Sequence, residues 1–345
     1  MRKTVVLVLL LAGVHVAAQD AQTLRFYANL KKLSKKGFMF GHQDDLAYGV
    51  NWKYEPGRSD VKEVVGDYPA VYGWELGGLE TGNPKNLDGV PFDKMRQFIK
   101  EGYERGGVIT ISWHARSPLD APKGAWDTTH GTVAAILPGG SHHQLYTSWL
   151  DKLADFFLSL KGIPVLFRPY HELTGNWFWW GKNTCTAEEF KTLWRFTVNY
   201  LRKAPNLLYV YNTSGNFSTR EEYLERYPGD DVVEMISFDA YQYNGLNIGK
   251  QLEIVSKIAG EKDKLFALAE TGYEAIPDAH WWTGTLLKAI GEYNLSYVLV
   301  WRNYGVNNHF YAPHKGHGSA KDFVKFYEEE RTLFEKDVAK EKLYQ

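Results

Sequence analysis

Two glutamates carry the strongest chemical signal in the sequence. Glu172 lies in the segment FRPYHELTGNWFWWG, residues 167–181, and Glu270 lies in the segment FALAETG, residues 266–272. Each follows a short apolar run that is typical of a buried strand. Cleavage of a glycosidic bond needs a carboxylic acid to protonate the leaving oxygen, and a carboxylate to attack the anomeric carbon or activate water there. The aromatic residues after Glu172 offer flat apolar faces that suit sugar rings. Together the two segments favour chemistry on a sugar.

These glutamates belong to a regular series of apolar runs. Eight runs of four to six residues lack strict alternation, which is typical of strands buried on both faces. The runs are Gly37–Phe40, Pro69–Gly73, Val108–Ser112, Pro164–Phe167, Leu207–Tyr211, Val233–Phe238, Leu265–Ala269 and Ser296–Trp301. Amphipathic segments that are typical of helices separate several of them, at Phe92–Arg105, Leu145–Leu160, Ala187–Lys203 and Leu252–Ala259.

Alternating strand and helix patterns predict an α/β fold with a parallel sheet. Eight such units in one chain predict a (β/α)8 TIM barrel, formed by a single domain over residues 19–345. A dinucleotide-binding open sheet is disfavoured because no GxGxxG motif follows the first run.

Polar residues follow the apolar runs at the predicted strand ends. In a (β/α)8 barrel the carboxyl ends of the strands form one face, where active sites are built. The residues expected there are His42, Gln43, Asp44, Asp45, Glu75, Trp113, His114, His171, Glu172, Asn212, Asp239, Tyr241, Glu270, Trp301, Arg302 and Asn303. This gathering predicts one catalytic mouth. Asp44, Asp45 and Glu75 are each as suited to holding a loop as to touching a sugar.

The same segments resemble a known family. FRPYHELTGNWFWWG resembles the acid/base segment of glycoside hydrolase family 26, whose best-known members are β-1,4-mannanases, and AETGYE resembles its nucleophile segment. FGHQDD, ISWHARSP, FDAYQY and VLVWRNY are similar to other strand-end motifs of that family, so the resemblance runs from about Phe40 to Tyr304. The family belongs to a clan of retaining (β/α)8 glycosidases. It has His where most of the clan has Asn before the acid/base glutamate, and His171 matches it.

The resemblance implies hydrolysis of β-1,4-mannosidic bonds in mannan, galactomannan or manno-oligosaccharides, by double displacement. It implies Glu172 as the acid/base and Glu270 as the nucleophile. Six further residues are implied to bind the substrate. His171 would contact the sugar or the neighbouring carboxylate, Trp177 would stack on the leaving-group side, and Tyr241 would hydrogen-bond the nucleophile. His114, Trp301 and Arg302 would bind the sugar on the non-reducing side. We expect no metal and no cofactor.

Other interpretations of these residues stay open. A related β-glycanase on the same scaffold, a xylanase or a mixed-linkage glucanase, is the alternative within the same chemistry. A metal-dependent hydrolase would use His42, Asp44, His114, His171 and Asp239 as ligands, although no His-x-His or His-Glu-x-x-His spacing is present. A non-catalytic sugar-binding protein would need the aromatic and His residues alone. Trp179 and Trp180 could equally pack beneath their loop.

Composition narrows the range of partners. The chain has 40 Lys and Arg against 41 Asp and Glu, a formal net charge of 40 − 41 = −1. This balance gives no electrostatic support for binding nucleic acid or an anionic membrane. Cys185 is the single cysteine, which excludes an intramolecular disulfide. We expect a β-mannan or manno-oligosaccharide substrate, no nucleic acid, no membrane anchor and a monomer.

The first eighteen residues have the pattern of a secretory signal peptide. Arg2 and Lys3 form a positive start, residues 5–12 are apolar, and Val16, Ala17 and Ala18 precede Gln19. We expect cleavage after Ala18 and export to the periplasm or the medium.

Overall fold

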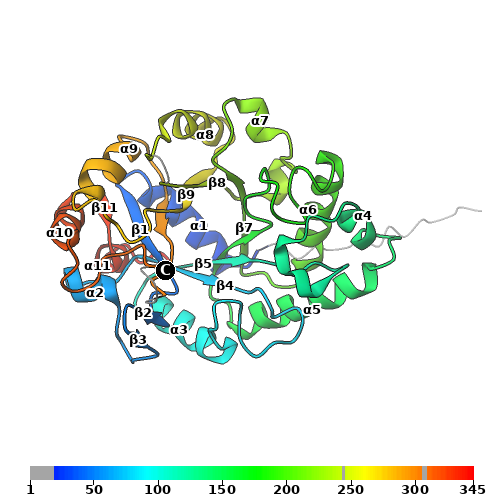
Figure 1. Cartoon of the computed structure of the whole chain (residues 1–345), viewed down its shortest axis with the longest axis horizontal. Helices are drawn as coiled ribbons and strands as arrows, with labels where there is room; N and C mark the ends of the chain where they lie inside the picture. The colour runs from blue at the N-terminus through cyan, green and yellow to red at the C-terminus, as the bar shows by residue number, and fades with distance from the viewer. Residues whose placement is uncertain (1–18, 243–244, 305–308) are drawn as a thin grey trace, which may run out of the picture.

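Eight parallel strands pair side by side and close into a barrel (Figure 1). The computed structural model describes residues 19–242, 245–304 and 309–345, so the predicted signal peptide, residues 1–18, lies outside the described residues. The barrel strands are β1 (Phe38–Gln43), β4 (Val71–Glu75), β5 (Val108–Trp113), β6 (Val165–Pro169), β7 (Leu207–Ser214), β8 (Met235–Tyr241), β9 (Leu265–Gly272) and β10 (Tyr297–Val300). They pair in chain order, and β10 closes the ring on β1, with Met39 opposite Tyr297.

The chain forms eleven α-helices among the described residues, and those between the strands surround the barrel in the pattern that the sequence predicts. They are α1 (Ala21–Leu33), α2 (Asp60–Val65), α3 (Phe92–Glu104), α4 (Thr132–Ile136), α5 (His143–Ser159), α6 (Ala187–Leu201), α7 (Arg220–Leu224), α8 (Gly249–Glu261), α9 (Lys288–Ile290), α10 (Ala320–Glu328) and α11 (Glu335–Lys340). The four predicted helices correspond to α3, α5, α6 and α8. In the described part of the chain, no helix combines the length and the hydropathy that a membrane span requires. The (β/α)8 prediction is confirmed.

Short elements complete the fold. The hairpin of β2 (Tyr48–Gly49) and β3 (Trp52–Lys53) follows β1, and β11 (Thr332–Leu333) pairs parallel with the start of β1. A 3-10 stretch at Ala121–Trp126 lies in the long connection after β5, and a π-helical stretch at Trp282–Leu287 leads into α9.

Local sequence signals explain where helices begin. In α6, the Thr186 hydroxyl accepts from the Glu189 backbone N–H and the Glu189 carboxylate accepts from the Thr186 N–H, which is a capping box. In α1, the Asp20 carboxylate accepts from the Thr23 N–H at 2.7 Å. The tail of α1 carries Lys31 and Lys32, whose charges suit the negative end of the helix dipole.

The strands separate two apolar layers. Residues such as Leu166 and Val210 point into the barrel, whereas Phe167 and Tyr211 point outward against the helices. Successive side chains on a strand point to opposite faces, so this alternation fills both layers from the same eight strands.

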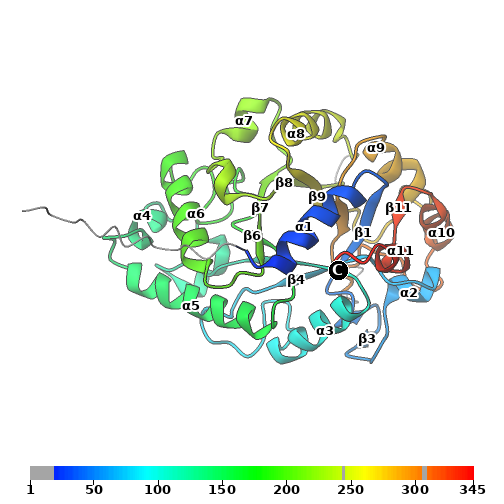
Figure 2. The same cartoon turned by 180° about the vertical axis from the view of Figure 1, so that it is seen from behind.

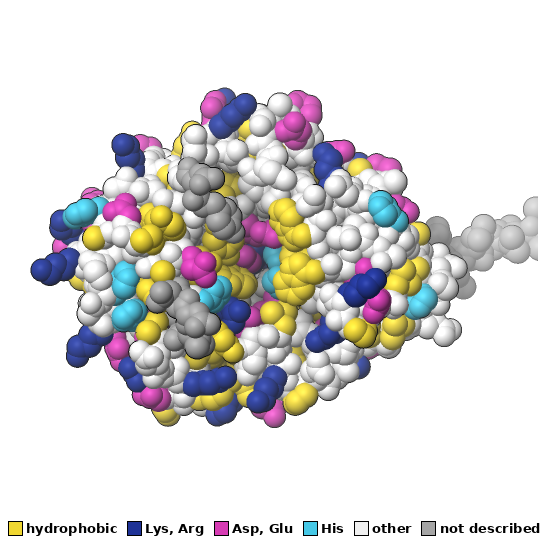
Figure 3. All heavy atoms as spheres, viewed as in Figure 1, with side chains coloured by type: hydrophobic (Ala, Val, Ile, Leu, Met, Phe, Trp, Pro, Cys, Tyr) yellow, Lys and Arg dark blue, Asp and Glu magenta, His cyan; other side chains and the backbone are white. Residues whose placement is uncertain are grey.

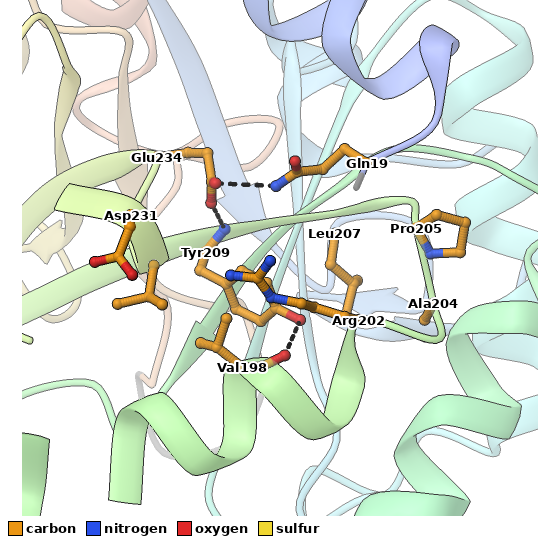
Figure 4. A pocket seen from close by; sticks show the side chains of 10 residues that line it. Gln19, Val198, Arg202, Ala204, Pro205, Leu207, Tyr209, Asp231 and Glu234 are labelled. Atoms are coloured by element: carbon orange, nitrogen blue, oxygen red, sulfur yellow. Dashed lines mark hydrogen bonds between the residues drawn. The ribbon is translucent and has the colours of Figure 1, made fainter. Parts of the chain in front are cut away.

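Helix α1 lies across the amino-terminal end of the barrel (Figure 2). Its buried residues Phe26, Leu30 and Leu33 belong to the same apolar cluster as the inward-facing strand residues. Each such side chain contributes about 1.5–3 kcal/mol when it is fully buried. A cavity of about 60 Å³ beside this end is lined by residues that include Gln19 and Glu234, and the Gln19 amide donates to the Glu234 carboxylate at 2.9 Å (Figure 4). Helix α1 and the contact between Gln19 and Glu234 cover the amino-terminal end of the barrel. The open mouth is therefore at the carboxyl ends of the strands.

Candidate active site

The carboxyl groups of Glu172 and Glu270 meet at the barrel mouth. Glu172 lies three residues beyond the end of β6 and Glu270 lies in β9, the fourth and seventh strands of the barrel. One carboxylate oxygen from each of them, and one from Asp239 in β8, lie within 4.8 Å of one another. Acidic and His side chains line a hollow in the centre of this face, with hydrophobic side chains along its edges (Figure 3). Two carboxyl groups this close can act on opposite sides of one bond in a bound ligand.

The surroundings of Glu172 suit a proton donor. The Trp177 indole N–H donates to Glu172 Oε2 at 2.7 Å, and the Glu172 backbone N–H donates to Asn212 Oδ1 at 3.2 Å. Burial and the neighbouring Glu270 charge raise the pKa of Glu172 to about 7, although the Trp177 hydrogen bond acts in the opposite direction. Glu172 can therefore be protonated near neutral pH.

Glu270 is held by donors on both of its carboxylate oxygens. The Arg168 guanidinium donates to Oε1, and the Tyr241 hydroxyl donates to Oε2 at 2.9 Å. Arg168 also lies 3.3 Å from Asp239, which accepts from the Asn212 amide at 2.9 Å. Burial and the Glu270 charge raise the pKa of Asp239, while Arg168 opposes this rise. These contacts orient the buried Glu270 carboxylate.

The contact with Arg168 is one that a structural carboxylate at this mouth would make, and it is also compatible with a reactive carboxylate. Glu172 has no such cation contact among the described residues.

Two histidines form a pair beside the carboxylates. His114 Nε2 lies 3.1 Å from His171 Nε2, and His114 Nδ1 lies 2.8 Å from Glu75 Oε2. Burial alone would lower the pKa of His114, but the Glu75 charge and hydrogen bond raise it above its ordinary value. The pKa of His171 is lowered by burial and by His114. Since the Glu75 carboxylate also accepts from Ser112 and from the His114 backbone N–H, Glu75 is a support for the histidine pair.

The aromatic run after Glu172 divides into two kinds of residue. Trp177 is partly exposed, whereas Trp179 and Trp180 are fully buried. Their indole N–H groups donate to the backbone oxygens of Ala115 and His171 at 2.9 Å each. Trp179 and Trp180 therefore pack beneath the loop, and Trp177 alone of the three presents a face beside Glu172.

A groove of about 610 Å³ extends from Glu172 along the ends of β7 and β8. It is lined by Glu172, Trp177, Ser214, Gly215, Asn216, Asp239, Ala240, Tyr241, Gly245, Leu246, Asn247, Ile248 and Gln251. Its size lies within the range of small-molecule binding sites, and it has an aromatic ring and several polar groups along its length.

Trp301 and Arg302 follow β10 on the same face. Trp301 is partly exposed, and Arg302 Nη1 lies 3.1 Å from Asp88 Oδ1 and 3.4 Å from the Tyr48 hydroxyl. Burial raises the pKa of Asp88 to about 6, although the Arg302 charge lowers it. Tyr48 in turn donates to Asp44 at 2.5 Å. This polar cluster is a second feature that a ligand in the mouth can meet.

The five residues weighed as metal ligands do not converge. His42 pairs with Asp45 at 2.7 Å, Asp44 binds Tyr48, and His171 pairs with His114. Among the described residues, the carboxylates that do gather are Glu172, Asp239 and Glu270, and Arg168 contacts the last two. Asp45 also accepts from the Ser59 hydroxyl at 3.0 Å, so it serves to hold a loop.

Sequence reasoning passed over two residues of the mouth. Trp126 stacks on His114, with ring centroids 5.3 Å apart and planes 20° apart, and 54% of its surface is exposed. Asp88 binds Arg302 as described above. Both residues lie in connections between strands. Neither apolar periodicity nor a position at a strand end identifies a residue there as part of the site. A tryptophan in a loop next to a strand-end histidine was the available signal for Trp126.

Comparison with known proteins finds relatives over most of the chain. A model of glycosyl hydrolase family 26 matches residues 15–328. The chain is 30% identical over 350 residues to a mannan endo-1,4-beta-mannosidase from Bifidobacterium adolescentis, a match that covers 91% of this chain and 34% of that protein. A mannan endo-1,4-beta-mannosidase from Bacillus subtilis is 30% identical over 268 residues, 72% of this chain and 70% of that protein. The chain thus spans about a third of the length of the first of these relatives.

A solved structure has a similar fold over nearly the whole chain. A GH26 beta-mannanase from Bacteroides ovatus superposes with a TM-score of 0.91 at 46% identity, over 95% of this chain and 98% of that one. The barrel and its connections are therefore shared with a protein of that description.

Proposed function

Because this chain belongs to glycosyl hydrolase family 26, we propose that it hydrolyses β-1,4-mannosidic bonds in mannan, galactomannan or manno-oligosaccharides with net retention of configuration. The observation that carries the mechanism is the approach of Glu172 and Glu270, whose nearest carboxylate oxygens lie within 4.8 Å. A carboxyl separation of about 5–5.5 Å suits direct attack by one carboxylate, whereas about 6.5–9.5 Å is needed to admit a nucleophilic water.

In the first step Glu270 attacks the anomeric carbon, and protonated Glu172 gives its proton to the leaving glycosidic oxygen. The C–O bond to the leaving sugar breaks as the bond to Glu270 forms. The hydrogen bonds from Arg168 and Tyr241 support this role, since they fix the direction of the Glu270 carboxylate. The pKa of about 7 supports the role of Glu172 as an acid.

In the second step water attacks the same carbon and frees Glu270. Esterified Glu270 carries no charge, so one of the causes that raise the pKa of Glu172 is removed. Glu172, now ionised, takes the proton of the incoming water. One carboxyl group thus serves as acid and then as base.

The substrate would lie across the mouth between aromatic and polar contacts. Trp177 would stack on the leaving-group side, in the groove that starts at Glu172. His114, Trp301 and Arg302 would bind the non-reducing side, and Trp126, stacked on His114, would extend that surface. His171 would contact the sugar or the neighbouring carboxylate. A flat exposed indole suits the apolar face of a mannosyl ring.

A product time course tests this proposal. The enzyme is incubated with β-mannan, galactomannan, defined manno-oligosaccharides, xylan and mixed-linkage β-glucan, and products are separated by length. Release of manno-oligosaccharides with no cleavage of the other two polymers is expected, and preferential cleavage of xylan or glucan would favour the alternative β-glycanase. NMR of the first product should show the β-anomer, and an initial α-anomer would establish inversion instead.

Two controls address the other classes. Activity should survive exhaustive dialysis against EDTA, and its loss with recovery on adding a divalent metal would favour a metal-dependent hydrolase. A sugar-binding protein without catalysis would bind mannohexaose and leave it intact on prolonged incubation.

We further propose export of a protein that begins at Gln19 and folds as one catalytic domain over residues 19–345. The Arg2-Lys3 start and the small residues before Gln19 support it. Intact-mass analysis of the exported protein should show the loss of residues 1–18, and retention of Met1 would contradict the proposal. Size-exclusion chromatography with light scattering tests the expected monomer.

A further inference from the structure

The alternation of inward and outward side chains along β6 is interrupted just before Glu172. In β6, Leu166 and Arg168 face the barrel interior, and Val165 and Phe167 pack outward in the layer under the helices. Successive strand residues point to opposite faces, so Tyr170 should turn inward and His171 outward. The structure has the reverse arrangement. The Tyr170 ring lies in the outer layer, while His171 and Glu172 both face the mouth.

This reversal depends on an unusual backbone at Tyr170. Its φ is +55°, and that of Glu172 is +52°, both in the left-handed region. A bulky aromatic residue rarely adopts that conformation, and it persists only where surrounding contacts impose it.

The contacts that impose it come from the two helices that flank β6. The Tyr170 hydroxyl bonds the Tyr146 hydroxyl of α5, and it lies 2.8 Å from the Thr197 hydroxyl of α6. Tyr146 and Thr197 are themselves 2.7 Å apart, so the three hydroxyls form a closed triangle. All three residues are fully buried. The rings of Trp180 and Trp194 pack edge-on against Tyr170. A hydroxyl in this position ties the turn to elements outside the barrel.

We propose that Tyr170 is a positioning residue for the acid/base, and that its hydroxyl, held by Tyr146 and Thr197, fixes the left-handed turn that brings the Glu172 carboxyl over the leaving oxygen. This inference rests on the function proposed above. Without the Tyr170 hydroxyl, the backbone at Tyr170 relaxes from the left-handed region toward a common conformation. The Glu172 carboxyl then moves away from the leaving oxygen. Proton donation suffers, while attack by Glu270 does not.

The test measures how strongly the reaction depends on its leaving group. A good leaving group departs without a proton, so 2,4-dinitrophenyl β-mannobioside needs no help from Glu172, whereas mannotetraose does. In Tyr170→Phe, kcat/KM on mannotetraose should fall about tenfold, because small misplacements of a catalytic group are costly. On the dinitrophenyl substrate it should change less than about twofold. Tyr223→Phe is the matched control. It removes another buried hydroxyl, which donates to the Ser237 backbone oxygen at 3.0 Å. It should leave the ratio of kcat/KM on the two substrates at its wild-type value.

A second set of variants guards against simple loss of folding. The double change Tyr146→Phe with Thr197→Val removes both partners and leaves Tyr170 intact, and it should reproduce the effect of Tyr170→Phe. The single change Thr197→Ser keeps a hydroxyl at this position and should keep the wild-type ratio of kcat/KM on the two substrates. An unchanged ratio in both Tyr170→Phe and the double variant would overturn the inference. Absence of wild-type activity on both substrates would instead contradict the proposed function, so the two failures are distinguishable.

Discussion

The indole N–H of Trp177 donates to Oε2 of Glu172 across 2.7 Å. Trp177 lies in the loop after β6 and also lines the groove that begins at Glu172. In the proposed mechanism, the residue that would offer a stacking face to a sugar therefore also contacts the acid that would protonate the leaving oxygen. Binding on this side of the mouth and proton transfer would then be coupled through one side chain.

Two substitutions of Trp177 separate these roles. Trp177→Phe keeps an aromatic face and loses the N–H, which opposes the rise in the pKa of Glu172 caused by burial and by Glu270. The pKa should therefore rise, and the alkaline limb of the pH profile of kcat/KM should move to higher pH. Trp177→Ala should also lose roughly 0.5–1.5 kcal/mol of stacking, which corresponds to a drop of about 2- to 13-fold in kcat/KM on oligosaccharides. An unchanged profile in Trp177→Phe would remove the hydrogen bond from the mechanism.

The pH dependence of activity should reflect Glu172. The acid must be protonated in the free enzyme, and its pKa is about 7, so kcat/KM should fall as the pH rises through that value. A profile that stays flat to pH 9 would contradict this assignment.

The free energy of unfolding should also depend on the ionisation of Glu172. Folding raises the pKa of Glu172 from 4.5 to about 7, so the folded state binds the proton more tightly. Unfolding free energy therefore falls as the pH rises from about 4.5 to 7, and the loss is complete above that range. Glu172→Gln should be more stable than wild type at pH 8 by on the order of 1–3 kcal/mol, with no such gain at pH 4. Urea unfolding at the two pH values measures the difference, and an equal gain at both would point to a cause other than ionisation.

Substitutions of the two proposed catalytic glutamates should have different effects. Glu270→Ala should be nearly inactive on every substrate, because no bond to the anomeric carbon can form. Glu172→Ala should retain the first step on aryl glycosides with good leaving groups, accumulate the covalent intermediate, and be rescued by azide. Mass spectrometry of the trapped enzyme and rates with azide are the readouts. If azide rescued Glu270→Ala and did not rescue Glu172→Ala, Glu270 would be the acid/base and Glu172 the nucleophile.

Trp126 should contribute to binding and not to bond cleavage. Trp126→Ala removes an exposed ring beside His114, so KM for longer manno-oligosaccharides should rise by roughly 2- to 10-fold with kcat nearly unchanged. Trp126→Phe, which keeps an aromatic face, should recover most of the loss. A fall in kcat with constant KM would indicate that Trp126 acts through His114 instead.

Much of this molecule was predictable from local pattern. Eight apolar runs predicted all eight barrel strands, because a strand buried on both faces needs a continuous apolar stretch wherever it lies. The strand-end positions of Glu172 and Glu270 followed directly, since parallel strands bring their carboxyl ends to one face.

Tertiary structure decided which of these residues touch. Arg168 and Glu270 are 102 positions apart in the chain and in contact only because the barrel closes. Trp177 and Trp179 differ in exposure although they are two positions apart in one loop, since the turn of that loop and not its composition sets which ring is covered.

The reversal at Tyr170 has the same origin. Alternation along β6 assigns that ring to the barrel interior, and the hydroxyls of Tyr146 and Thr197, on two different helices, hold it outside. A sequence determines local periodicity because neighbouring residues share one backbone geometry. Contacts between separate elements depend on how those elements pack, and here packing overrides periodicity at the residue that brings Glu172 into the mouth.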